Sequence, residues 1–201
     1  MAEREYILGS HNSWSFLRPR HWWHRPFAFT ARCQSADISQ QYFDYGVRCF
    51  DLRIRAGKDG SPIVAHGMVE YDITDARIMD YLAFMDHRGD CCVRLVHEVR
   101  TRRQYTMYRV YKFKLFCDRV TRLFPNVRFW CGRNLYNWQV DYDFGDDPTC
   151  EEAYSSVKKP VLLDDWFPYL YARMRNRNVI KKGTDKDILL MDFVNIGKVK
   201  T

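Results

Sequence analysis

The sequence predicts an α/β domain of the TIM-barrel type, and two observations lead to this prediction. Short apolar segments typical of buried strands alternate with segments that carry apolar residues at helical spacing, which is the pattern of a mostly parallel sheet. In addition, a residue capable of chemistry stands at or just beyond the end of nearly every predicted strand. These residues are His11, Arg53, His66, Glu98, Arg133 and Asp192.

Catalytic residues gather at the carboxyl ends of the strands in a (β/α)₈ barrel, whereas an open doubly wound sheet uses a single crevice. The sequence contains no glycine-rich phosphate-binding motif of the GxGxxG or GxxxxGK type, which would favour the open sheet. We therefore expect a barrel. Because about 200 residues is the lower limit for eight units, we expect it to be compact and distorted, with one or two units shortened.

The composition is that of a folded protein with an anionic partner. The chain has 201 residues, of which 46% are hydrophobic and 16% aromatic, so we expect one domain over residues 1–201 and exclude disorder. The net charge of +7 favours a phospholipid headgroup, a membrane surface, a phosphorylated metabolite or nucleic acid as partner. A charge of this size also serves solubility alone.

The cysteines and the N-terminus indicate a reducing, intracellular location. The seven cysteines are odd in number and most lie in apolar runs, and no pair of CxxC motifs indicates a structural zinc site. The N-terminus has no signal-peptide pattern, and no apolar run approaches the ~20 residues of a membrane span. Peripheral membrane contact or export by a non-classical route are the alternatives.

The first part of the chain is predicted to form a strand, a loop and a helix. Glu5–Ser10 is a short apolar run that ends in a Gly-Ser turn, which is typical of a buried strand. Trp14–Ala31 mixes aromatic residues with arginines and holds two prolines that oppose a continuous helix. Ser35–Gly46 has a helical stripe, with Ser35 as the expected N-cap and its glycine as the stop.

The middle of the chain is predicted to form a pair of strands, a helix and a further strand. The apolar runs Arg48–Ile54 and Pro62–Ala65 flank a polar turn with an Asp-Gly signal. Thr74–His87 has its apolar residues at helical spacing. Cys91–Val99 is an apolar run that indicates a strand.

Arg103–Phe124 is predicted to be a long, basic and aromatic helix, followed by a strand at Asn126–Cys131. The core-facing residues of this helix are expected to be Tyr108, Tyr111, Leu115 and Val120. Tyr136–Cys150 is acidic and predicted to be a loop. The remaining predicted elements are a strand at Pro160–Leu163, a helix at Trp166–Arg177 and a final strand at Asp187–Phe193.

His11 and His66 are the residues most suited to carry a reaction. Cleavage of a phosphodiester by in-line attack needs a base for the nucleophile and an acid for the leaving oxygen, and two histidines can take these roles. The guanidinium of Arg53 matches the phosphate oxygens and stabilises developing charge. A single histidine is more often a hydrogen-bonded structural residue, but two that follow strands, together with an arginine, favour the catalytic interpretation.

Three stretches of the sequence resemble a known family. The stretches SHNSWSF (10–16), QSADISQQYFDYGVRCFDLRI (34–54) and VAHG (64–67) resemble the X-domain of phosphatidylinositol-specific phospholipase C and its bacterial relatives. The resemblance is specific over residues 5–67 and continues more weakly through LVHEV, FWCGRNLYNW and MDFVN. It implies a distorted TIM barrel, which agrees with the argument from strand ends.

The resemblance also implies roles for individual residues. His11 corresponds to the general base that deprotonates the inositol 2-hydroxyl, and His66 to the general acid that protonates the diacylglycerol oxygen, so that a cyclic inositol phosphate forms first. Asp51 and Arg53 match the acidic-x-arginine pattern of the metal-independent bacterial branch, in which the guanidinium takes the place of calcium. Asp192 is expected to orient His11, because the first and last strands of a closed barrel are neighbours.

The sequence combines features of the metal-independent and the calcium-dependent branch. Asn12 and Glu98 match positions of the calcium-dependent enzymes, and a bound calcium would have Asn12, Asp51 and Glu98 as ligands. Arg53 decides against this, because its fixed positive charge would repel a divalent cation. We therefore expect no cofactor, and we expect Asn12, Glu98 and Arg133 to contact substrate.

Other motifs are weaker. Arg18, Arg20, Trp22 and Trp23 are suited to contact with an anionic membrane, although a loop packed over the barrel mouth would explain them as well. His21-x-x-His24 has metal-site spacing only in a helix, which the nearby prolines oppose.

Two further histidines are expected to lie outside the site. His87-Arg88-Gly89 mimics a motif of glycerophosphodiester phosphodiesterases but stands at a helix end and lacks their metal ligands, so we interpret it as a decoy. His97 alternates with Glu98 along the strand and is expected to be structural.

The leading hypothesis is a metal-independent phosphodiesterase of the phosphatidylinositol-specific phospholipase C type. A related barrel phosphodiesterase that cleaves a glycerophosphodiester or sphingolipid is an alternative, and so is a non-catalytic module that binds phospholipid headgroups. Nucleic-acid binding is unlikely, because only the charge and the basic helix at 103–124 favour it.

Overall fold

The computed structural model describes residues 6–99, 106–131, 142–145, 147–153 and 167–196. Eight strands and six helical segments form in this part of the chain. The strands are β1 (Ile7–Ser10), β2 (Cys49–Ala56), β3 (Pro62–His66), β4 (Val69–Glu70), β5 (Cys92–His97), β6 (Arg128–Trp130), β7 (Cys150–Glu152) and β8 (Ile188–Met191). The helices are η1 (Trp22–Phe27), α1 (Ala28–Ala31), α2 (Ile38–Phe43), α3 (Asp75–Arg88), α4 (Met107–Leu123) and α5 (Pro168–Lys182).

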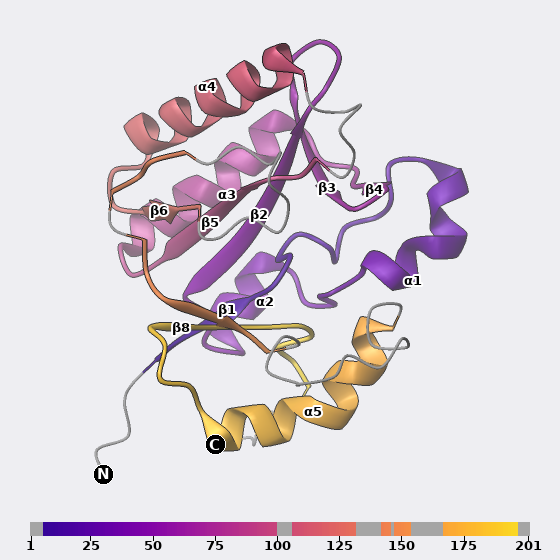
Figure 1. Cartoon of the computed structure of the whole chain (residues 1–201), viewed down its shortest axis with the longest axis vertical. Coiled ribbons are helices and arrows are strands. Elements are labelled where there is room, and N and C mark those ends of the chain that lie inside the picture. The colour runs from indigo at the N-terminus through magenta and orange to yellow at the C-terminus, as the bar shows by residue number, and fades with distance from the viewer. Residues whose placement is uncertain (1–5, 100–105, 132–141, 146, 154–166, 197–201) are drawn as a thin grey trace.

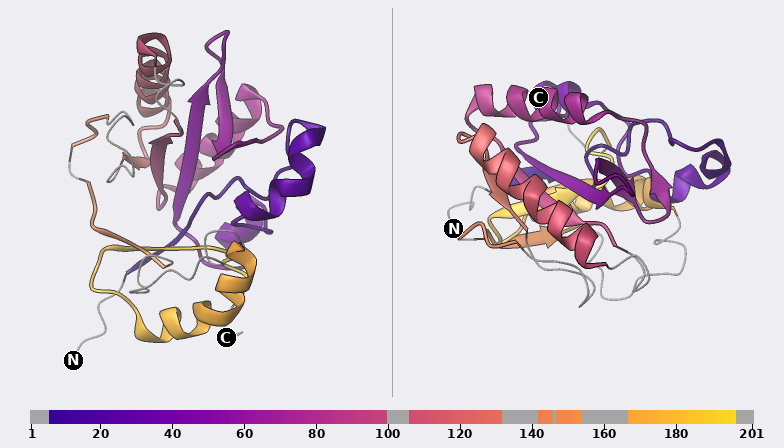
Figure 2. Two further views of the ribbon diagram at one scale, coloured as in Figure 1. Left: turned by 45° about the vertical axis from the view of Figure 1, so that its right-hand side comes forward. Right: turned by 90° about the horizontal axis from the view of Figure 1, so that it is seen from above.

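The strands form one curled sheet that makes up a distorted half-barrel (Figure 1). Six strands run parallel in the order β6-β5-β2-β1-β8-β7, and β3 and β4 are added to β2 as an antiparallel extension. Helix α5 lies under β8, and α3 and α4 lie beside the half of the sheet that holds β2 and β5 (Figures 1 and 2). The predicted TIM-barrel-like α/β class is confirmed, with a sheet that is incomplete among the described residues.

Close packing along β1 requires a glycine. The strand lies between β2 and β8, and a Cβ atom built on Gly9 would stand 2.5 Å from Cδ2 of Leu190 and 3.1 Å from Cβ of Cys49. A side chain here would push the neighbouring strands apart. Gly9 and Ser10, which were predicted to form a turn at the end of the strand, therefore belong to β1 itself.

The helix α3 confirms its predicted pattern, whereas α4 packs through a different face from the one predicted. Ile78, Leu82 and Met85 of α3 are fully buried, and Thr74 caps its N-terminus. In α4, Tyr108, Tyr111 and Leu115 are exposed, which contradicts the prediction, and only Val120 is buried as expected. The buried residues of α4 are Val110, Phe113, Phe116, Cys117 and Val120.

The sequence of α4 contains two stripes at helical spacing, and burial favours the one without hydroxyl groups. Burial of phenylalanine or valine removes no polar group from water, whereas a buried tyrosine needs a hydrogen-bond partner for its hydroxyl group. Spacing alone could not distinguish the two stripes.

Several predicted boundaries were wrong. The N-cap of α2 is Asp37 rather than Ser35, because Asp37 forms a reciprocal capping box with Gln40. The stretch expected to be a loop, Trp14–Ala31, contains η1 and α1, and the acidic loop ends in strand β7. The short strand β4 was not predicted. The strand expected at Pro160–Leu163 lies outside the described residues.

None of the helices in the described part of the chain is long and apolar enough to cross a membrane.

Candidate active site

The register of the parallel strands brings three predicted site residues to one level. Ser10 of β1 pairs with Phe50 of β2 and with Met191 of β8, so the next residues along these strands are His11, Asp51 and Asp192. Arg53 lies two residues further along β2, and Glu98 follows β5 on the other side of β2. One cluster therefore contains residues that follow the carboxyl ends of β1, β5 and β8 and two residues from within the longer strand β2.

His66 reaches this cluster by a different route, because β3 runs antiparallel to β2. The strand β2 continues past the end of β1, turns, and returns as β3, with Ile54 opposite Val64. His66, at the end of β3, thus comes back to the level of the site. Gly67 follows with φ +63°, a conformation that favours glycine, and its N–H donates to Oε1 of Glu98 at 2.8 Å.

His11 is held between a carboxylate and a guanidinium. Its Nδ1 lies 2.7 Å from Oδ1 of Asp192, and its Nε2 lies 2.7 Å from Nη2 of Arg53. Because a guanidinium can only donate, Nε2 is the acceptor and Nδ1–H donates to Asp192, which makes His11 the neutral Nδ1 tautomer. Burial lowers the pKa of His11, but the carboxylates of Asp192 and Asp51 together outweigh this effect, and the pKa lies above its ordinary value.

The guanidinium of Arg53 is fixed by two buried carboxylates. Its Nε donates to Oδ2 of Asp51 at 2.9 Å, and its Nη1 lies 3.5 Å from Oε2 of Glu98. Burial opposes ionisation of both carboxyl groups, yet the pKa of Asp51 is held well below its ordinary range, chiefly by Arg53 and then by Arg94. Arg53 likewise lowers the pKa of Glu98 against the effect of burial. Both acids are therefore ionised at neutral pH.

His66 lies beside His11 and is oriented by the backbone. The two imidazole rings meet edge to face with their centroids 5.8 Å apart. Nδ1 of His66 lies 3.0 Å from the carbonyl oxygen of Ala31, which also accepts hydrogen bonds from Tyr71 and from the side chain of Asn12. Because the carbonyl can only accept, Nδ1 carries a proton and Nε2 is the atom that can exchange one.

The electrostatic surroundings of His66 differ from those of His11. Burial and the positive charge of Arg53 lower the pKa of His66 to about 4. In the free protein, His66 is therefore neutral at neutral pH. The two histidines have pKa values displaced in opposite directions, because the ring of His11 has the Asp192 carboxylate at hydrogen-bond distance, whereas burial and Arg53 dominate at His66.

Asn12 adopts a left-handed conformation with φ +45° at the turn after His11. Its backbone N–H donates to Oδ2 of Asp51 at 2.9 Å, and its side-chain nitrogen donates to Ala31. Among the described residues, no hydrogen-bond partner was found for the buried Oδ1 atoms of Asn12 and Asp51. These two oxygen atoms are acceptors that a ligand could use.

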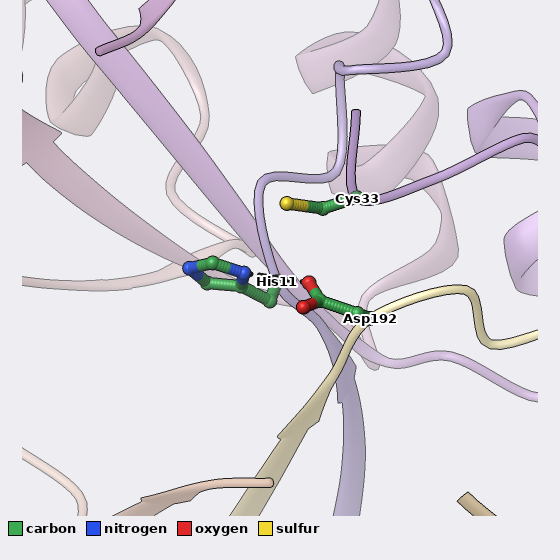
Figure 3. A group of neighbouring side chains, drawn as sticks. All are labelled: His11, Cys33 and Asp192. Carbon is green, nitrogen blue, oxygen red and sulfur yellow. Dashed lines mark hydrogen bonds and ion pairs between the residues drawn. The ribbon is translucent and has the colours of Figure 1, made fainter. Parts of the chain in front are cut away.

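Cys33 and Gln34 also lie at this site, although neither was predicted from the sequence. The buried Cys33 places its Sγ 3.9 Å from Nδ1 of His66 and close to the pair of His11 and Asp192 (Figure 3). Gln34 donates to the carbonyl oxygens of His11 and Met191 and so ties the ends of β1 and β8 together. Gln34 stands at the start of the stretch that carries the family resemblance, whereas no local signal marks Cys33.

The other residues that the sequence singled out are either outside this cluster or outside the described residues. Arg133 is outside the described residues. His97 is buried and stacks on Phe113, which agrees with a structural role. His87 lies in the last turn of α3. His21 pairs with Glu70 at 3.3 Å, and neither it nor His24 belongs to the group of metal-ligating side chains found in the described part of the chain.

Comparison with solved structures identifies the fold. The phosphatidylinositol-specific phospholipase C from Listeria monocytogenes is 14% identical with a TM-score of 0.51, over 93% of this chain and 87% of that one. A mutant of the Staphylococcus aureus enzyme is 16% identical with a TM-score of 0.59, over 93% and 84% of the two chains. A further structure of this enzyme, which concerns its membrane binding, has a TM-score of 0.56 at 16% identity, over 93% and 85% of the two chains.

No family model matches the sequence, and no curated protein sequence matches it. The likeness to the solved structures shows that the chain has the TIM-barrel-like fold of the bacterial phosphatidylinositol-specific phospholipases C.

The lowered pKa of His66 predicts a specific pH dependence of stability. The unfolded chain protonates this histidine near pH 6.5, at about its ordinary pKa, whereas the folded protein resists protonation down to a pKa of about 4. The stabilising contribution of neutral His66 is therefore complete above about pH 6.5 and is lost as the pH falls toward 4.

The measurement is urea unfolding at a series of pH values for wild type and His66→Gln, with NMR titration of the imidazole signals. His97, whose pKa is also lowered to about 4, gives the same trend in both proteins, so the difference between them isolates His66. A His66 signal that titrates near pH 6.5 in the folded protein would contradict the prediction.

Proposed function

We propose that this protein is a metal-independent phosphodiesterase of the phosphatidylinositol-specific phospholipase C type. The observation that carries the proposal is the arrangement of two imidazoles around one guanidinium. Nη2 of Arg53 lies 2.7 Å from Nε2 of His11, and the ring of His66 lies beside that of His11. A base, an acid and a phosphate-binding cation are the groups that in-line cleavage of a phosphodiester needs.

In the proposed reaction, the phosphate draws the guanidinium of Arg53 away from His11. The substrate hydroxyl then takes the place of Nη2 at Nε2, and His11 accepts its proton as the oxygen attacks phosphorus. The imidazolium that forms is stabilised by Asp192, which lies 2.7 Å from Nδ1. The raised pKa of His11 is consistent with this role, because it strengthens the base once Arg53 has moved.

His66 would complete the step as the general acid. The bond between phosphorus and the diacylglycerol oxygen breaks as Nε2–H of His66 protonates that oxygen, and a cyclic phosphodiester remains. A pKa of about 4 leaves His66 unprotonated in the free protein, so the acid form must be created in the complex. A phosphodiester anion bound next to His66 raises its pKa, because an adjacent negative charge favours the imidazolium.

Asp51 and Glu98 serve as positioning residues for Arg53. Their carboxylates hold the guanidinium between β2 and β5, at the mouth of the half-barrel. The substrate contacts expected for Asn12, Glu98 and Arg133 remain part of the proposal. The inositol headgroup itself is proposed from the sequence resemblance over residues 5–67 and from the structural neighbours, which are phosphatidylinositol-specific phospholipases C.

We also propose that the reaction requires no calcium. The alternative calcium ligands are Asn12, Asp51 and Glu98, and two of the oxygen atoms near this position have no partner among the described residues. The guanidinium of Arg53 nevertheless contacts both carboxylates and supplies a fixed positive charge at that place. A dication would have to displace it, so the donor set does not fit calcium.

A phospholipid substrate implies contact with a membrane surface, for which the segment at Arg18–Phe27 is suited. Its base is tied to β4 by hydrogen bonds and by the bridge between Pro19 and Tyr71. Trp22 and Trp23 are 72% and 52% exposed, which favours membrane contact over a loop packed on the barrel mouth. The arginines at 18 and 20 are exposed as well and would meet anionic headgroups.

His11→Ala and His66→Ala are each expected to reduce turnover of phosphatidylinositol about 10²- to 10⁴-fold, because each removes one proton-transfer group. Phosphorus NMR of the products should show a cyclic inositol phosphate as the first product of the wild type. The same assay with lysolipids and sphingomyelin determines the headgroup.

The exposed His87, in the last turn of α3, provides the matched control, and His87→Ala should retain wild-type turnover. Wild-type turnover in both site variants would rule out the mechanism. Lipid binding without turnover, unchanged in His66→Ala, would instead indicate a non-catalytic headgroup-binding protein.

Removal of divalent metals with EGTA should leave turnover at or above its original level, because Arg53 supplies the positive charge at the phosphate. The assay compares untreated enzyme, EGTA-treated enzyme and treated enzyme with added calcium. Complete loss of turnover that calcium restores would overturn the metal-independent proposal.

The double variant Trp22→Ala, Trp23→Ala should bind anionic phospholipid vesicles at least about tenfold more weakly, because it removes two aromatic side chains from the interface. Cosedimentation with vesicles measures the binding, and cleavage of a soluble inositol phosphodiester should be unaffected. Met107→Ala, at a residue of α4 that is 74% exposed, is the matched control. Equal vesicle binding by wild type and the double variant would exclude this segment as the contact.

A further inference from the structure

Three side chains with different metal-ligating atoms meet beside the catalytic base. A ring nitrogen of His11, Sγ of Cys33 and a carboxylate oxygen of Asp192 all lie within 4.8 Å of one another, and all three residues are buried. We take the nitrogen to be Nδ1, because Nδ1 lies 2.7 Å from Asp192 whereas Nε2 faces Arg53. They come from the end of β1, the segment after α1 and the end of β8, and their ligating atoms face a common space (Figure 3). No other such group of three was found in the described part of the chain.

We propose that this cluster binds a Zn²⁺-type transition-metal ion, and that the bound ion switches the enzyme off. The binding site stands on the geometry alone, whereas the inhibitory effect rests on the proposed function. Imidazole nitrogen, thiolate sulfur and carboxylate oxygen are the ligands of zinc, and three protein ligands leave a fourth tetrahedral position for water. The sulfur ligand disfavours Ca²⁺ and Mg²⁺, which prefer oxygen.

The charges and protons of the site are consistent with such an ion. Burial and the nearby carboxylate of Asp192 raise the pKa of the Cys33 thiol, so it is protonated in the free protein. Zinc binding releases this proton to solvent and forms the thiolate. The thiolate and Asp192 then supply two negative charges that balance the dication. Arg53 lies on the opposite, Nε2 side of the His11 ring and does not occupy the metal position.

Metal binding removes the ability of His11 to act as a base. The ion takes the lone pair of Nδ1, so the proton that Nδ1 donates to Asp192 has to move to Nε2. A protonated Nε2 cannot accept a proton from the substrate hydroxyl. It also faces the N–H of Arg53, 2.7 Å away, as donor against donor, so the guanidinium must leave. One bound ion therefore disturbs three groups, namely the base His11, the carboxylate of Asp192 that orients it, and the guanidinium of Arg53 that would bind the phosphate.

Binding is tested on the purified protein without any substrate. Co²⁺ should give the visible absorption of a tetrahedral site and a thiolate-to-metal charge-transfer band, and calorimetry should show one Zn²⁺ bound per chain. Cys33→Ala should abolish the charge-transfer band and weaken Zn²⁺ binding by about 100-fold or more, since even loss of an outer-shell partner costs 10–100-fold. Cys33→Ser provides a second variant that retains a side chain of similar size.

Cys150→Ala is the matched control, because Cys150 is the most accessible of the cysteines in the structure and lies on β7. Its Co²⁺ spectrum and Zn²⁺ affinity should equal those of the wild type. Unchanged Zn²⁺ binding in Cys33→Ala, loss of binding in Cys150→Ala, or a Co²⁺ spectrum without a thiolate band would each overturn the site.

The inhibitory effect is tested by turnover under increasing Zn²⁺. Wild type should lose activity over the concentration range in which Zn²⁺ binds, EGTA should restore it, and Cys33→Ala should need about 100-fold more Zn²⁺ for the same loss. Activation by Zn²⁺ would overturn the inhibitory assignment. A protein that binds Zn²⁺ as described but cleaves no phosphodiester would refute the proposed function and leave the metal site standing.

Discussion

The buried guanidinium of Arg53 is the interaction on which the rest of the site depends. Asp51 is fully buried and Glu98 nearly so, and Arg53 is the largest of the influences that lower the pKa of both carboxyl groups against the effect of burial. Removal of one partner from such a buried ion pair costs about 3–5 kcal/mol, because the remaining charge is left without compensation. The same guanidinium donates to His11 and lowers the pKa of His66. One side chain thus lowers the pKa of both histidines, in His66 together with burial and in His11 against the stronger effect of the nearby carboxylates.

The loops around this guanidinium are ordered by polar side chains rather than by regular structure. Ser15 accepts hydrogen bonds from the backbone of Cys33 and Gln34, and Gln41 donates to the carbonyl of Ser13. The carbonyl of Ala31 accepts hydrogen bonds from four side chains, which are those of Asn12, Cys33, His66 and Tyr71. Buried polar groups are costly unless they are paired, so these bonds restrict the loops to one arrangement. The orientation of His66 follows from that arrangement.

The sequence predicted the fold class and the meeting of polar side chains from different strands for a physical reason. Parallel strands connected by helices bring their carboxyl ends to one edge, so residues that follow predicted strands can be placed together without knowledge of the side-chain packing. The contact between Asp192 and His11 was expected on this ground and is present in the structure. His66 was placed correctly by its pattern, but through an antiparallel strand rather than a parallel one. The position of His66 depends on how far β2 extends before the chain turns and returns as β3.

Local patterns therefore determined which segments form strands and helices and which polar residues stand at the strand ends. Tertiary structure decided what those patterns leave open. Two stripes of α4 have helical spacing, and only packing against the sheet selected Phe113 over Tyr111. Cys33 approaches His11 and Asp192 because the segment after α1 is held beside the strand ends, where the N–H of Cys33 donates to Ser15 and its carbonyl accepts from the N–H of Phe193. Contacts between residues distant in the chain depend on the whole packed structure, and no short stretch of sequence encodes them.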